Sequence, residues 1–193
     1  MFLPVYPFIF FFVSCTNSST QEAGSINREK EPFEKQSFFP VTHYIKGQLY
    51  EIKNMGINPL KFTTYNNHTD SVWLKIEELD DAVKEFLQPV IDTANLITLF
   101  TETKFADQSL DAFTFTYDAT GILPDTMTWK HWDVYIDPAT GKVKRLYLVK
   151  DAGNRRILQL TWQSNKWCKI STLNTDQNGV ISIEKEEKII WEF

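Results

Sequence analysis

The chain has 193 residues, of which 42% are hydrophobic and 15% aromatic, and this composition excludes a protein that is disordered throughout. The formal net charge is −5 and no basic tract occurs, which argues against nucleic-acid binding, because contacts to phosphates need clustered Lys and Arg. The length leaves room for one domain with a sizeable core.

The first feature along the chain is an uncharged apolar run over residues 2–13. A helix needs about 20 apolar residues to span a bilayer, so this run is too short to do so. A run of this length beside the N-terminus is typical of a signal peptide. The residues that end it, Phe12-Val13-Ser14-Cys15, resemble the lipobox of a bacterial lipoprotein. That resemblance implies that residues 1–14 are removed and that Cys15 becomes the lipid-attachment site. An unlipidated secretory signal and a buried N-terminal strand are the alternatives.

A polar segment separates this signal from the predicted domain. Residues 15–37 are rich in Ser, Thr, Asn, Gln and charged side chains, and such a segment cannot bury enough surface to fold. As a flexible coil it would extend roughly 25 Å. We therefore expect a lipidated Cys15, a flexible linker to residue 37, and one domain over residues 38–193.

Helical spacing dominates the first part of this domain. Apolar residues recur at intervals of three to four over 40–54, and Gly56 follows as a stop, which predicts a helix there. A strand is predicted over 59–65 and a turn over 66–70. Residues 71–76 could be a short strand or lead into the next helix. A second helix is predicted over 77–88, with acidic residues in its first turns, where the helix dipole favours them.

After Phe105 the apolar residues alternate with period two and turn residues separate the runs, which predicts a chain of antiparallel strands. We expect an α+β fold, in which a curved antiparallel β-meander of about six to eight strands packs against the two N-terminal helices. The expected strands are 113–117, 132–136, 143–149, 157–162, 167–173, 180–183 and 188–193.

Few residues point to chemistry. Residues 174–182 resemble the start of an EF-hand calcium loop, but the twelfth position is Lys185 instead of the bidentate Glu, and an Asn-Gly hairpin turn explains the same residues. The spacing of the three histidines predicts no zinc site. Cys168 lies between apolar residues and is interpreted as a small buried hydrophobe in preference to a reactive thiol. No metal, cofactor or catalytic residue is predicted.

The tryptophans and tyrosines are the remaining candidates for a binding site. Trp132, Trp162 and Trp191 share a side of their strands with aliphatic residues and are predicted to fill the layer between sheet and helices. Trp129 and Tyr135 lie on the more polar side, and we expect this pair to be exposed and to bind a ligand.

In its amino-acid composition, which is rich in Asn, Lys, Phe and Ile, the whole chain resembles the small envelope lipoproteins of Bacteroidetes-type bacteria. Those proteins share no single activity. That resemblance implies a lipid-anchored protein of the cell envelope, at the outer membrane on its periplasmic side or at the surface. We expect a non-enzymatic binding or interaction module whose partner is an envelope protein or an apolar or carbohydrate ligand. A hydrolase with a site not visible in the sequence, and a carrier of a lipid or other apolar ligand, are the alternatives.

Overall fold

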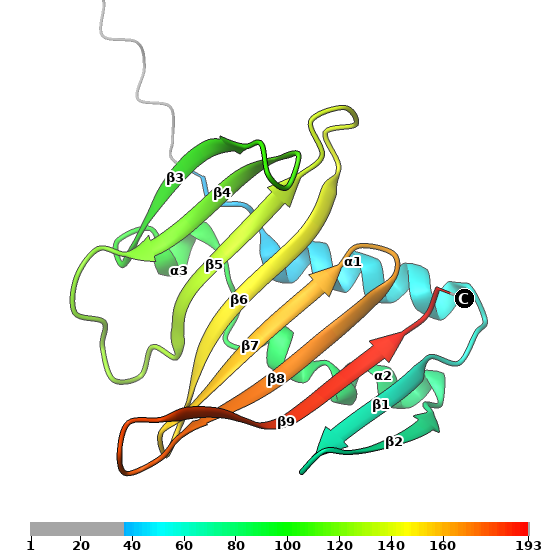
Figure 1. Cartoon of the computed structure of the whole chain (residues 1–193). Coiled ribbons are helices and arrows are strands. Elements are labelled where there is room, and N and C mark those ends of the chain that lie inside the picture. Colours follow the sequence, from blue (N-terminus) through cyan, green and yellow to red (C-terminus); the bar gives the residue numbers. More distant parts are fainter. Residues whose placement is uncertain (1–36, 193) are drawn as a thin grey trace, which may run out of the picture. The chain divides into compact units, whose positions relative to one another are not determined.

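The computed structural model describes residues 37–192, so the predictions for the signal, Cys15 and most of the linker lie outside the described residues. Nine strands form one sheet (Figure 1). The strands are β1 Leu60–Tyr65, β2 His68–Trp73, β3 Phe100–Asp107, β4 Ala112–Ala119, β5 Trp129–Ile136, β6 Val143–Gly153, β7 Arg156–Gln163, β8 Trp167–Thr175 and β9 Ile181–Ile190. The helices are α1 Val41–Asn54, α2 Leu79–Ala82 and α3 Thr93–Leu96, with two 3-10 turns, η1 Ile76–Glu78 and η2 Lys84–Phe86.

Every pair of neighbouring strands in the sheet is antiparallel, which confirms the predicted antiparallel pairing. The strand order is β2-β1-β9-β8-β7-β6-β5-β4-β3. Strands β3 to β9 thus form a meander, and the β1–β2 hairpin extends the sheet beyond β9.

The predicted strands differ from the observed ones, because β2 and β3 were not assigned as strands and β9 was divided into two. The charged stretch between Ile183 and Ile189 was interpreted as a break between two strands, whereas β9 runs through it. Charged side chains are tolerated there because they pair with neighbours: Lys61 Nζ lies 2.6 Å and Lys185 Nζ 3.0 Å from carboxylate oxygens of Glu187. Strand β3 begins within residues 90–105, a segment that was assigned to neither a helix nor a strand from the sequence.

Helix α1 agrees with the predicted helix 40–54. Its apolar stripe is buried against the sheet, because residues three and four apart share one face of a helix. Two polar contacts fix its position. Tyr44 Oη donates to Ser164 Oγ at 2.8 Å, and the backbone N–H of Asn165 donates to Gln48 Oε1 at 2.9 Å. The helix ends at Asn54 shortly before Gly56, which has a φ of +69°.

The second predicted helix is wrong in form, because residues 76–86 make three short turns instead of one helix. The hydrogen-bond pattern changes at Val83, whose N–H bonds to Leu79, whereas Phe86 N–H bonds to Val83 one residue nearer. Pro89 also disfavours helical geometry in the residue before it. The apolar residues predicted to face the core do so nonetheless, since Leu79, Val83 and Phe86 are fully buried.

The helices lie against one face of the sheet, and within residues 37–192 the other face carries no helix (Figure 1). The core between α1 and the sheet contains the three tryptophans predicted for it, Trp132, Trp162 and Trp191. Trp162 lies 5.1 Å from Trp191 and 5.3 Å from Phe86 between ring centroids. In this part of the chain no helix is both long and apolar enough to cross a bilayer.

Candidate functional site

The helix-free face carries a set of polar side chains in the middle of the sheet. Strand alternation places it there, since Trp132 and Val134 of β5 point into the core, whereas Asp133 between them and Tyr135 after them point the other way. Cross-strand pairing then aligns Asp133 with Tyr147 of β6, and Tyr147 with Thr161 of β7. A row of hydrogen-bonding side chains therefore crosses the central strands.

Two adjoining hollows follow this row, and together we call them the central groove. The larger, of about 400 Å³, is lined by Asp133, Tyr135, Arg145, Tyr147, Gln159, Thr161, Lys169 and Ser171. The smaller, of about 200 Å³, is lined by Ser109, Leu110, Ala112, Tyr135, Lys144, Arg145 and Gln163. Tyr135 and Arg145 border both hollows. Even without the smaller one, the larger hollow has a volume within the range of small-molecule sites, roughly 300 to 1,000 Å³.

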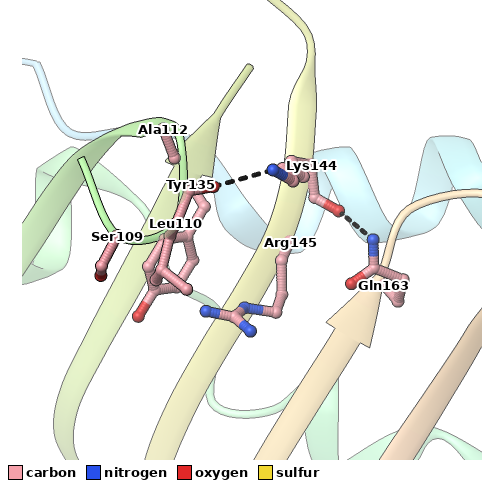
Figure 2. Close-up of a pocket in the computed structure, with 7 residues that line it drawn as sticks. All are labelled: Ser109, Leu110, Ala112, Tyr135, Lys144, Arg145 and Gln163. Atoms are coloured by element: carbon pink, nitrogen blue, oxygen red, sulfur yellow. Dashed lines mark hydrogen bonds between the residues drawn. The ribbon is translucent and has the colours of Figure 1, made fainter. Parts of the chain in front are cut away.

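Arg145 and Tyr135 stand side by side where the two hollows meet (Figure 2). The guanidinium carbon lies over the tyrosine ring, 4.2 Å from its centroid. A β-bulge helps to build this corner, because Tyr135 pairs with Arg145 and Ile136 with Val143, which leaves Lys144 as an extra residue. Lys144 Nζ donates to the Leu110 carbonyl at 2.9 Å and ties the β3–β4 turn to β6 (Figure 2).

Beside the groove, His131 lies between two carboxylates. Its Nδ1 is 2.7 Å from Asp118 Oδ1, and its Nε2 is 3.0 Å from Asp133 Oδ2. Asp133 also accepts hydrogen bonds from Thr116 Oγ1 at 2.6 Å and from Tyr135 Oη at 3.2 Å. Both ring nitrogens and both Asp133 oxygens are therefore engaged within the protein.

This network fixes the charges of its members. The hydrogen bond to Asp133, aided by Asp118, raises the pKa of His131 to about 9 against the opposing effect of burial. Burial alone would raise the pKa of Asp133, but the hydrogen bonds from His131 and Thr116 outweigh it and hold that pKa below its usual range. At neutral pH the pair is consequently an imidazolium beside a carboxylate.

Such a pair is poorly suited to acid–base catalysis. A general base needs a free lone pair within reach of the substrate and a pKa near the working pH. His131 has neither, because it is protonated and both its nitrogens face carboxylates. The arrangement instead holds the groove-facing carboxylate of Asp133 in one position and one charge state.

A further hollow, of about 440 Å³, lies on the helix side of the sheet, beside residues 81–85. Its walls carry both signs of charge, and Lys61, Lys185 and Glu187 form ion pairs within it. Burial would raise the pKa of Glu187, but its bonds to Lys61 and Lys185 keep that pKa below the usual range. Only a few aliphatic side chains, including Leu158 and Ile170, border this space.

The two aromatic residues predicted as an exposed pair are in different places. Tyr135 is half-buried and borders the groove, so its assignment as a ligand-binding residue stays a prediction. Trp129 is fully buried, and its Nε1 donates to the Pro89 carbonyl at 2.8 Å, so the expected exposure was wrong. The cause is a bulge between Trp129 and His131, which shifts the alternation by one residue and turns the indole into the core.

Two interpretations of other residues are confirmed. Cys168 is 1% exposed, and burial raises the pKa of its thiol. The calcium-loop-like segment forms the β8–β9 hairpin turn, where Asp176 Oδ1 accepts hydrogen bonds from the backbone N–H groups of Asn178 and Val180. Among the described residues, no group of three or more His, Cys, Asp or Glu side chains is arranged to hold a metal ion.

Most of the groove residues were missed by sequence reasoning. Alternation alone puts Asp133 and Tyr135 on one side of a strand, and that signal was available. The contributions of Arg145, Tyr147 and Thr161 depend on strand register, which the bulges set and which no local pattern reveals.

Comparison of the chain with protein-family models, with curated proteins and with solved structures gave no match in any of the three.

Proposed function

We propose that this protein is a non-enzymatic binding module of the bacterial cell envelope, which holds a hydroxyl-rich ligand of the carbohydrate type in its central groove. In this proposal lipid attached to Cys15 tethers the domain to the outer membrane. The groove supplies the binding activity, and the N-terminal signal supplies the location.

The composition of the larger hollow is the observation that carries the proposal. All eight side chains that line it bear hydrogen-bonding groups, and none is aliphatic. They include both donors and acceptors, as recognition of neighbouring hydroxyl groups requires. Tyr147 and Gln159 are half-buried there, so their polar atoms are positioned by the sheet without being covered. An apolar ligand would leave these groups without partners, which costs free energy.

A hydrolase is less well supported. The titratable cluster beside the groove consists of His131, Asp133 and Asp118, and its proton sites are already occupied by one another. Hydrolysis needs a base or nucleophile that can change its protonation state during turnover. A pair locked as imidazolium and carboxylate favours binding over catalysis.

A lipid carrier is also less well supported. A carrier needs an apolar cavity for the acyl chain. The space between α1 and the sheet is filled by packed residues, among them Trp162 and Trp191. The hollow on the helix side is walled by ion-paired charged residues such as Lys61 and Glu187, whose desolvation by an acyl chain would be unfavourable.

The tether is tested by radiolabelled palmitate incorporation in the native host. We expect labelling of the wild-type chain, loss of labelling in Cys15→Ala, and retained labelling in Cys168→Ala, which removes the buried thiol as a matched control. Equal labelling of wild type and Cys15→Ala would overturn the proposed anchor.

The groove is tested by the binding of the full chain to an immobilised panel of neutral and acidic oligosaccharides, in a detergent that contains no sugar. We expect binding to at least one saccharide, weakened about tenfold in Gln159→Ala, because one hydrogen-bonding partner of the ligand is lost. Gln177→Ala, in the exposed β8–β9 turn, is the matched control and should bind as the wild type does. Failure of the wild type to bind any saccharide, or equal binding by Gln159→Ala, would contradict the proposal.

A further inference from the structure

We propose that the ligand of the central groove is an acidic saccharide, whose carboxylate is held by the guanidinium of Arg145. This inference rests on the proposed function and adds to it the charged group that the ligand carries.

Arg145 is the residue that carries the inference. It is half-buried, lies between the two hollows, and borders both. The ion pairs found among residues 37–192 do not include it. A half-buried guanidinium normally finds a carboxylate or phosphate partner, because removing its charge from water is unfavourable unless the charge is paired.

The orientation of the side chain leaves its donors accessible. The guanidinium lies over the ring of Tyr135 at 4.2 Å, so that ring covers one of its flat faces. The N–H groups of a guanidinium lie in its plane and point outward from its edge, so stacking itself does not use them. One of the five donors interacts with the hydroxyl of Tyr135, and the others stay available. The ring therefore orients a donor edge that matches the two oxygens of a carboxylate.

The other charged side chains that line the groove already have partners within the protein. Lys169 Nζ lies 3.1 Å from Glu186 Oε2, and Lys144 Nζ donates to the Leu110 carbonyl. The lining carboxylate, Asp133, is paired with His131. Arg145 has no carboxylate of the described residues within ion-pair distance and interacts only at longer range with that of Asp107. A single guanidinium suits a singly charged carboxylate better than a phosphate monoester, whose charge approaches two at neutral pH.

The rest of the groove indicates a saccharide in preference to a peptide carboxylate. A peptide would need apolar pockets for its side chains or a strand edge for its backbone. The larger hollow has no aliphatic lining, and it lies over strands β5 to β8, which are paired on both sides. Hydroxyl and amide groups such as those of Thr161 and Gln159 line the same hollow as Arg145 instead.

The probes are a galacturonate tetramer and its methyl-esterified form, which differ in the carboxylate charge while the sugar ring and its other hydroxyl groups stay the same. Binding to the full chain is measured by titration calorimetry at neutral pH in a sugar-free detergent. We expect the acidic tetramer to bind about tenfold more tightly than the ester, the size of one charge-assisted hydrogen-bonded contact. The preference should fall as salt is added.

Variants assign the effect to Arg145. Arg145→Gln should bind both tetramers with the affinity that the wild type shows for the ester, and Arg145→Lys should keep part of the preference through its charge. Arg155→Gln removes the same charge from the exposed β6–β7 turn and should keep the full preference. Far-ultraviolet circular dichroism of each variant establishes that the sheet is formed.

The outcomes separate this inference from the proposed function. Equal binding of both tetramers by the wild type, or an acid preference unchanged in Arg145→Gln, would overturn the role of Arg145 and leave a carbohydrate groove standing. Tighter binding of a sulfated or phosphorylated tetramer than of galacturonate would overturn the carboxylate. Tighter binding of a short peptide with a free C-terminal carboxylate would overturn the saccharide, and with it the proposed function.

Discussion

Replacement of His131 by Gln would remove the positive charge from between two carboxylates. In the folded protein, both imidazole nitrogens lie within 3.0 Å of carboxylate oxygens of Asp118 and Asp133. These contacts raise the pKa of His131 to about 9, from 6.5 for an ordinary histidine. Gln can still form hydrogen bonds, but it cannot take up a proton. The variant therefore isolates the part of the stability that depends on protonation.

The sign follows from the direction of this shift. Between pH 6.5 and 9 the folded protein holds a proton on His131 that the unfolded chain releases, so the free energy of unfolding falls as pH rises. The contribution is fully present below pH 6.5 and is lost by the time the pH has passed 9. One pKa unit corresponds to about 1.4 kcal/mol, which would give about 3 kcal/mol. The side chain is 27% exposed, and solvent screening reduces the expected value to about 2 kcal/mol.

The assay is urea unfolding followed by tryptophan fluorescence, at intervals from pH 6 to pH 9.5. We expect the stability difference between wild type and His131→Gln to shrink by about 2 kcal/mol over this range. The matched control is His43→Gln on the exposed side of α1, which should follow the pH dependence of the wild type. Parallel stability curves for wild type and His131→Gln would refute the argument that the carboxylates hold a proton on His131.

Three more predictions concern the core and one turn. Trp129→Phe should lower the free energy of unfolding by about 2 kcal/mol, because the fully buried indole is replaced by a smaller ring and its hydrogen bond to the Pro89 carbonyl is lost; an unchanged urea midpoint would contradict this. Cys168 should resist alkylation in the folded chain and react after denaturation, as followed by peptide mass spectrometry; modification at equal rates in both states would show that its burial is misjudged. Gly179→Ala should cost about 1 kcal/mol, because its φ of +82° disfavours a side chain, whereas Gly121→Ala, which meets open space, should be close to neutral; equal melting temperatures for the two would count against the strain.

The spacing of apolar residues was sufficient to predict a helix or strand wherever one periodicity applied to the whole element. Helix α1 was predicted because its buried residues keep helical spacing over 14 residues. Most strands of the meander were predicted because apolar residues alternate between turns. The same reasoning failed for residues 76–86, where buried residues keep helical spacing although the backbone does not form a continuous helix. The spacing of apolar residues indicates which side chains are buried, but it does not determine whether the backbone forms a continuous helix.

The candidate site was only partly predictable, because it depends on interruptions of the pattern. Tyr135 could be named from alternation, whereas Trp129 was assigned to the wrong face because one bulge lies between them. Arg145 reaches Tyr135 through a register that a second bulge sets. A bulge adds one residue to one strand and leaves little trace in composition, so a groove built across several strands cannot be read from any single one.

The pairing of β1 with β9 has a consequence for how the chain folds. Residues 60–65 are aligned with residues 185–190, so the sheet cannot take its final form until almost the whole chain is present. The apolar stripe of α1 likewise stays exposed until the later strands have formed, since Tyr44 and Gln48 contact residues more than 100 positions later. Contacts this distant in sequence make folding slow compared with that of helical bundles. For the exported chain proposed above, slow folding prolongs the unfolded interval in which a polypeptide can be threaded across a membrane.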